Sequence, residues 1–192
     1  STLLASNLQV ERYADKDLFS NLSVRYKSLA WKSVSKPKLS NCILVCYPQT
    51  ISRKEKWQHF LDSYCKTHYC IKLTPEPRAF GDPLNIKFLV NKEVPVEFRS
   101  WLKNRRPPIG DDWFIITAYN PHSKKSSEKD NCRYNKALKE SLLQKGLAFL
   151  EGIGQDPGLQ WPGEHHFLVF APYEVGFELM YRFRQNAIVI SS

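Results

Sequence analysis

The chain has 192 residues, of which 42% are hydrophobic, and a formal net charge of +9 at pH 7. This length and composition exclude a disordered chain and allow one large domain or two small ones. The apolar runs are too short to span a bilayer, and residues 1–13 lack the basic and apolar regions of a signal peptide, so we expect a cytoplasmic protein.

The positive charge is distributed unevenly along the chain. The net charge is +4 over residues 1–40, +6 over residues 41–110 and −1 over residues 111–192. A cationic surface most often meets an anionic partner, usually nucleic acid, although solubility alone accounts for part of such an excess. The distribution therefore predicts an anion-binding role for the N-terminal half.

The five cysteines are odd in number and lack paired C-x-x-C spacing, which favours reduced thiols in a reducing compartment. Two of them fall in a strand-like apolar run, where cysteine usually acts as a small buried hydrophobe. The cysteines are Cys42, Cys46, Cys65, Cys70 and Cys132.

Residues 1–40 form a predicted basic N-terminal arm, in which a weak helical rhythm leads into basic and aromatic residues. The simpler interpretation is an amphipathic arm that packs on the body of the protein. The alternative is an arm that folds against nucleic acid or a protein partner. Residues 36–38 (KPK) are typical of a linker.

Residues 41–110 predict a strand at 41–48, a helix, two strands at 70–73 and 86–90, and a short helix. Trp57, Phe60, Leu61 and Tyr64 share one face of the first helix, and Phe98 and Trp101 mark the second. A proline-bearing connector, 104–110, follows where a fourth strand is expected.

Residues 111–192 predict the order βαββαβ. The strands are expected at 113–119, 147–150, 166–170 and 187–190. The first helix is expected to start at a cap on Asp130 or Asn131 and to end at Gly146, and Pro172 starts the second. Residues 151–163 are predicted to be a loop rich in glycine and proline.

The two halves align strand for strand with a small drift in spacing. We therefore predict an α+β fold of two tandem ferredoxin-like units (βαββαβ), a diverged internal duplication, plus an N-terminal arm. The units would be a first, degenerate one at 41–110 and a second at 111–192. The alternative is that any two α/β halves look similar under loose alignment.

Several enzyme motifs are absent from the sequence, namely the phosphate-binding loop, the dinucleotide-binding glycine motif, H-E-x-x-H and G-x-S-x-G. Their absence disfavours nucleotide hydrolases, Rossmann enzymes, zinc proteases and α/β-hydrolases. A protein without catalytic activity is favoured, and an enzyme of an unfamiliar kind is the alternative.

Polar residues nevertheless gather at one end of the predicted C-terminal unit. A helix start with nearby Ser, Asn and Arg donors can bind a phosphate or carboxylate, and a Glu beside a His can exchange protons. Such residues also commonly cap turns and helices, which is the structural alternative. The catalytic candidates are His122, Glu164 and His165, and the ligand-binding candidates are Asn120, Ser123, Asn131, Arg133 and Asn135.

The histidines and carboxylates show no diagnostic metal spacing, so no metal and no cofactor are expected. His165 and His166 are adjacent on a predicted strand and should point to opposite faces of the sheet.

Two nucleic-acid surfaces are conceivable. Bases could stack on Trp113, Tyr119, Phe167 or Phe170 of the central strands, although these side chains could equally form a core. The alternative is electrostatic contact with phosphates, of RNA more than DNA, with little base specificity. The basic candidates are Arg53, Lys54, Lys56, Lys66, Lys72, Arg78, Lys103, Arg105, Arg106, Lys124 and Lys125.

Residues 113–190 carry the segments FIITAYNPHS, DNCRYNKAL, WPGEHHFLVF and RFRQNAIVI. With these segments the C-terminal part resembles a bacterial family of small uncharacterised proteins, known as a domain of unknown function. The resemblance implies a bacterial cytosolic protein and brings no activity with it.

Three functions are therefore weighed. The first is a basic, non-enzymatic nucleic-acid-binding protein that uses its N-terminal half. The second is a small enzyme or ligand-binding domain for an anionic or nucleotide-like substrate, with its site at the loop after strand 113–119. The third is a subunit of a larger assembly, in which the arm and Trp101 contact a protein partner.

Overall fold

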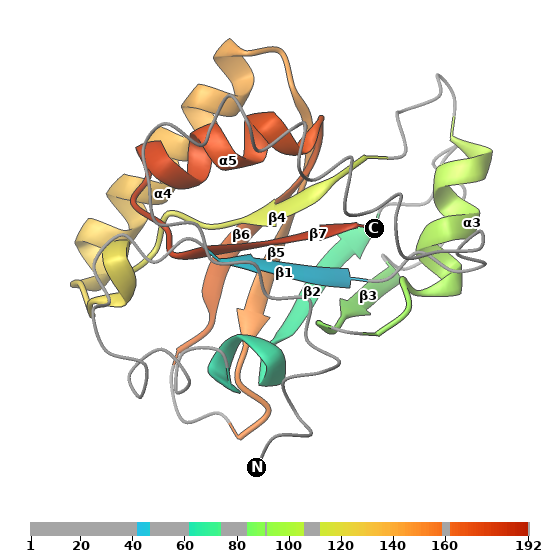
Figure 1. Ribbon diagram of the computed structural model, residues 1–192, viewed down its shortest axis with the longest axis horizontal. Helices are drawn as coiled ribbons and strands as arrows, with labels where there is room; N and C mark the ends of the chain where they lie inside the picture. Colours follow the sequence, from blue (N-terminus) through green and yellow to red (C-terminus); the bar gives the residue numbers. More distant parts are fainter. Residues whose placement is uncertain are drawn as a thin grey trace.

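The computed structural model describes residues 42–46, 62–73, 84–90, 92–105, 112–158 and 162–191. Within them, seven antiparallel strands form one sheet in the order β1-β7-β4-β6-β5-β2-β3 (Figure 1). The strands are β1 (Cys42–Cys46), β2 (His68–Leu73), β3 (Leu84–Phe88), β4 (Phe114–Ile116), β5 (Ala148–Gln155), β6 (Glu164–Phe170) and β7 (Ala187–Ser191). The helices are α3 (Val96–Asn104), α4 (Glu128–Gln144) and α5 (Tyr173–Arg182), with a 3-10 turn, η2 (Pro121–Ser123).

The C-terminal half has the predicted order β4-α4-β5-β6-α5-β7, which is confirmed. Its four strands are neighbours in the sheet, in the order β7-β4-β6-β5. This element order is that of the ferredoxin-like pattern.

The N-terminal half does not repeat this arrangement, so the predicted duplication is not confirmed. β1 lies at one edge of the sheet beside β7, whereas β2 and β3 extend the other edge beyond β5. A second unit of the same kind would pair β1 with β3, yet these strands lie at opposite edges. The hydrophobic pattern identified the strands of the N-terminal half but did not show which strands they pair with. They pair with the two edge strands of the C-terminal sheet, β7 and β5.

Some predicted features lie outside the described residues. These are the arm at 1–40, the residues of the first helix before 62, and the connector from 106 to 110. Residues 62–66 are helical, as predicted. In the described part of the chain, no helix has the length and apolarity needed to cross a membrane.

Two hydrophobic cores lie on opposite faces of the sheet. The helix-side core lies under α4 and α5 and contains Phe114, Ile116, Ala118, Leu138, Leu142, Phe167, Val169, Ala171, Phe177, Leu179, Met180, Ile188 and Ile190. The α3-side core contains Cys42, Ile71, Leu73, Ile86, Phe88, Val90, Val94, Phe98, Trp113, Ile115, Leu168, Phe170 and Val189. Figure 1 shows α4 and α5 on one side of the molecule and α3 on the other.

The sheet curls around the α3-side core, so that its two edges approach each other. The backbone N–H of Cys42 in β1 donates to the carbonyl of Lys92, which follows β3, at 2.9 Å. Val90 and Val94 share the α3-side core with Cys42. The hydrogen bond therefore covers part of an edge that would otherwise expose unpaired backbone groups.

β5 is longer than predicted, because residues 151–155 belong to the strand and not to a loop. One of the glycines that suggest a loop, Gly152, allows close packing instead. A Cβ on Gly152 would lie 2.2 Å from the Cys70 carbonyl oxygen and 2.7 Å from Nε2 of His166. Glycine in a strand often marks such a close approach of backbone.

The start of α4 also differs from the prediction. Ser127 caps the helix by accepting from the backbone N–H of Asp130 at 3.1 Å, and its hydroxyl donates to the Asp130 carboxylate at 2.7 Å. The helix therefore starts earlier than a cap on Asp130 or Asn131 would allow, which leaves Asn131 inside the first turns. The predicted end is confirmed, since Gly146 follows the helix with φ +66°.

Replacing Gly152 with alanine should destabilise the protein by about 1 to 3 kcal/mol, because the new Cβ collides with backbone that cannot move independently. The matched control is Gly154→Ala, whose Cβ would meet its neighbours at 3.4 Å or more and should change stability by less than about 1 kcal/mol. Urea unfolding of both variants measures the difference. Equal effects would contradict the packing described for β5.

A polar network at the end of β4

The chain leaves β4 through a turn in which Asn120, His122 and Ser123 have φ values of +47°, +57° and +57°. Left-handed backbone is unfavourable for residues other than glycine and persists where the surroundings hold it. The backbone N–H of His122 donates to the carbonyl of Arg184 at 2.7 Å, which anchors the turn to the segment between α5 and β7.

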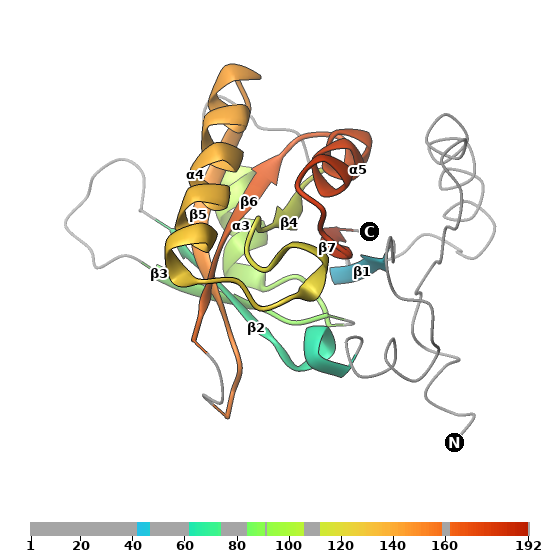
Figure 2. The same cartoon turned by 90° about the vertical axis from the view of Figure 1, so that its left-hand side faces the viewer.

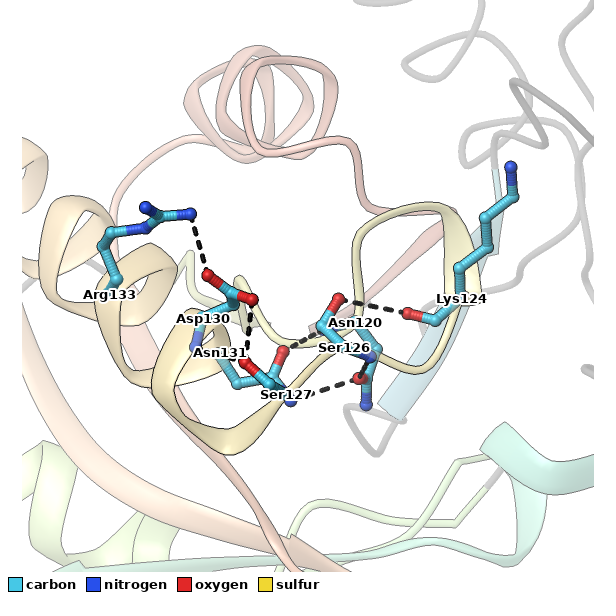
Figure 3. A network of polar contacts seen from close by, with 7 residues as sticks. All are labelled: Asn120, Lys124, Ser126, Ser127, Asp130, Asn131 and Arg133. Carbon is cyan, nitrogen blue, oxygen red and sulfur yellow. Dashed lines mark hydrogen bonds and ion pairs between the residues drawn. The ribbon is translucent and has the colours of Figure 1, made fainter.

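Two asparagines lock this turn to α4 (Figure 3). The backbone N–H of Asn120 donates to Oδ1 of Asn131 at 2.8 Å, and Nδ2 of Asn131 donates back to Oδ1 of Asn120 at 3.1 Å. The same Oδ1 of Asn120 accepts from the backbone N–H of Ser126 at 3.0 Å. Both polar ends of the Asn131 amide point at Asn120, so this side chain fixes the direction of the loop.

Two further amide side chains bind backbone groups of the same segment. Oδ1 of Asn135 accepts from the N–H of Ala118 at 3.1 Å, and Nε2 of Gln185 donates to the carbonyl of Tyr119 at 3.1 Å. Asn131, Asn135 and Gln185 are all buried. Their hydrogen bonds match the structural alternative, in which the polar residues shape a turn.

Glu164 joins the network from the start of β6. Its Oε1 accepts from Nδ2 of Asn120 at 2.6 Å. Burial raises the pKa of the Glu164 carboxyl, and the hydrogen bond from Asn120 opposes the shift. The structure thus brings together four predicted site residues, Asn120, Asn131, Asn135 and Glu164, at one end of the C-terminal half.

Arg133 does not join them. Its guanidinium is bonded to Asp130 at 2.9 Å, and its side chain is 70% exposed. Figure 3 shows it on the side of Asp130 away from Asn120. Arg133 therefore does not bring its charge to the network.

The histidines are separated as well. His165 is exposed, with its ring 6.0 Å from that of Tyr119, whereas His166 is buried on the opposite face, as expected for adjacent strand residues. Burial lowers the pKa of His122, helped by the charges of Arg184 and Lys124. No group of three His, Cys, Asp or Glu side chains in the described residues could hold a metal ion.

His166 is the most isolated polar side chain of the site. Neither of its buried ring nitrogens has a hydrogen-bond partner among the described residues, and burial lowers its pKa to about 3. The Glu164 backbone opposes this shift without reaching hydrogen-bond geometry. The ring packs instead against Gly152 and lies 5.8 Å from the ring of Tyr69, so it is a neutral part of the interior.

Ser123 links the turn to partners that the sequence alone did not reveal. Its Oγ shares a hydrogen bond with the Tyr64 hydroxyl at 3.0 Å and accepts from Nδ2 of Asn186 at 2.9 Å. The partners lie 59 and 63 residues away along the chain. The segment RFRQNAIVI, with Gln185 and Asn186 before a strand, was the available signal for this side of the network.

The aromatic residues considered for stacking on bases are part of the protein interior. Trp113, Tyr119, Phe167 and Phe170 expose at most 8% of their surface, and Phe167 and Phe170 lie on opposite faces of the sheet. Of the two interpretations given for these aromatic residues, the core is confirmed. Bases cannot reach these rings in the folded protein.

The described basic candidates lie at the surface. Lys66, Lys72, Lys103, Lys124 and Lys125 are exposed, and the half-buried Arg105 lies over the Trp101 ring at 4.8 Å. The remaining candidates lie outside the described residues, namely Arg53, Lys54, Lys56, Arg78 and Arg106.

The polar network falls inside a recognisable family region. Residues 116–188 match the family model described as protein of unknown function DUF3293. This match confirms the resemblance of the C-terminal half to an uncharacterised family. No curated protein and no solved structure matches the chain. The DUF3293 region contains Asn120, Asn131, Asn135 and Glu164, whereas β1, β2, β3 and α3 lie outside it.

Truncating either buried asparagine should destabilise the fold. Asn131→Ala and Asn135→Ala each leave a loop N–H without its acceptor, which should cost about 1 to 3 kcal/mol. Asn104→Ala, at the exposed end of α3, is the control and should change stability by less than about 0.5 kcal/mol. Thermal or urea unfolding measures all three. Near-neutral effects at 131 and 135 would refute the structural role.

The raised pKa of Glu164 predicts a pH-dependent stability. The carboxyl binds its proton more tightly in the folded state, so its favourable contribution is complete below its ordinary pKa of 4.5 and is lost as the pH rises through the folded-state value. Glu164→Gln keeps an acceptor for Asn120 but does not titrate. The wild type should therefore lose stability relative to this variant as the pH rises towards neutrality. A difference in unfolding free energy that does not change with pH would contradict the burial of this group.

Proposed function

We propose that the protein binds nucleic acid, RNA more than DNA, through basic residues of its N-terminal half, and that it has no catalytic activity. The observation that carries this proposal is the contrast in net charge between the two halves, +10 over residues 1–110 and −1 over residues 111–192. Four exposed lysines of the N-terminal half form no ion pair with a described residue. They are Lys66, Lys72, Lys87 and Lys92.

In the C-terminal half, four basic side chains are paired with carboxylates. The pairs are Arg133 with Asp130, Lys136 with Glu140, Lys139 with Glu151, and Lys145 with Glu178. Lys124, Lys125, Lys129 and Arg184 are also exposed and form no ion pair with a described residue, but the carboxylates of this half outnumber its basic residues, ten to nine. The excess of positive charge therefore lies on the N-terminal half, where phosphates would release bound counterions.

The polar network supports a non-enzymatic role. The amides of Asn120, Asn131, Asn135 and Gln185 already bind backbone groups or one another, so they have little capacity left for a substrate. Contacts to phosphates alone carry little sequence information, so we propose weak base specificity. The resemblance to a bacterial family also makes a bacterial cytoplasm the proposed location.

Titration of the full chain with fluorescent RNA across salt concentrations tests this function. Binding that neutralises three phosphates of a single strand should weaken by more than about tenfold between 50 and 200 mM salt. DNA of the same sequence is the comparison and should bind more weakly. Absence of binding at low salt, or an affinity that does not change with salt, would overturn the proposal.

A further inference from the structure

The sheet extends beyond the helices that cover it. On the face that carries α4 and α5, the strands β4, β6 and β7 are buried in the helix-side core. β2 and β3 contribute described residues to the α3-side core but none to the helix-side core. No described helix packs on this part of the helix-side face, which we call the bare face. Figure 1 shows α4 and α5 on the other side of the molecule from β3, and Figure 2 shows the same separation for α5.

The bare face carries a row of side chains fixed by strand register. His165 of β6 pairs with Ile153 of β5, Ile153 pairs with Cys70 of β2, and Cys70 pairs with Lys87 of β3. At a strand spacing of about 4.8 Å, this row crosses about 14 Å of sheet. His165 and Lys87 are exposed, and Ile153 and Cys70 between them are half-buried.

Lys72 stands in the next row, opposite Asn85, and is a diagonal neighbour of Lys87 on the same face. Both lysines are exposed, and neither forms an ion pair with a described residue. The carboxylate on this face of β5, Glu151, is bound by Lys139 of α4 at 2.5 Å. Two positive charges are therefore left beside a partly apolar floor.

We propose that this bare face, formed by His165, Ile153, Cys70, Lys72 and Lys87, binds single-stranded RNA. Phosphates contact Lys72 and Lys87, and a base lies over the floor and the imidazole of His165. Single strands combine a charged backbone with exposed base faces, which fits a surface that has both lysines and a histidine ring. In a duplex the base faces are stacked on one another, so a duplex would contact only the lysines, through its phosphates. This inference rests on the proposed function and locates it.

Charge reversal at the face tests the inference. The variant Lys72→Glu/Lys87→Glu is compared with Lys129→Glu/Lys136→Glu, which makes the same charge change on exposed positions of α4. The probe is a short, unstructured oligouridine RNA. The first variant should lose at least about tenfold in affinity and reduce the salt slope by about 1.4, whereas the control should lose less than about threefold. Unchanged unfolding midpoints show that both variants are folded.

A second variant separates single strands from duplexes. His165→Ala should weaken oligouridine binding by about fivefold or more and leave an RNA duplex of the same length unaffected. An equal loss of affinity for both probes, or no loss of affinity for either, would overturn the stacking part of the inference.

The outcomes distinguish the two proposals. If the wild type binds oligouridine and both double variants reduce the affinity equally, the bare face is not the binding site, while the proposed function stands. If the wild type does not bind RNA at low salt, both fail.

Discussion

The pairing of β2 with β5 is the contact on which the rest of the structure depends. It joins the N-terminal strands to the DUF3293 region, and it requires Gly152 because a Cβ there would meet the Cys70 carbonyl at 2.2 Å. Through this contact, β2 and β3 extend a sheet whose helices stop short of them. The bare cationic face exists because the sheet is wider than its helical cover.

The turn after β4 and the surface of β2 and β3 differ in how far their polar groups are already bonded. At the end of β4, buried amides of Asn131 and Asn135 hold a left-handed turn, and the half-buried Glu164 accepts a hydrogen bond from Asn120. These groups satisfy one another, so they stabilise the loop and offer few free donors. The exposed Lys72 and Lys87 lie in strands outside the family region, and in our proposal these strands add the binding surface.

The sequence predicts local elements better than their partners. The βαββαβ order, Gly146 as the end of α4, and the opposite directions of His165 and His166 follow from hydrophobic period and turn chemistry. Gly152 looked like a loop residue, because its close contact with Cys70 and His166 depends on strands far apart in sequence. For the same reason the sequence could not show that the Asn131 side chain is hydrogen-bonded to the turn at Asn120, or that Phe170 is buried in the α3-side core.

Mapping of backbone amide chemical shifts during titration with oligouridine tests the central claim most directly. The largest shifts should fall on His165 and on β2 and β3, around Cys70, Lys72 and Lys87, with small changes in α3 and α5. Shifts confined to those helices or to the turn at Asn120, or no shifts at low salt, would contradict it.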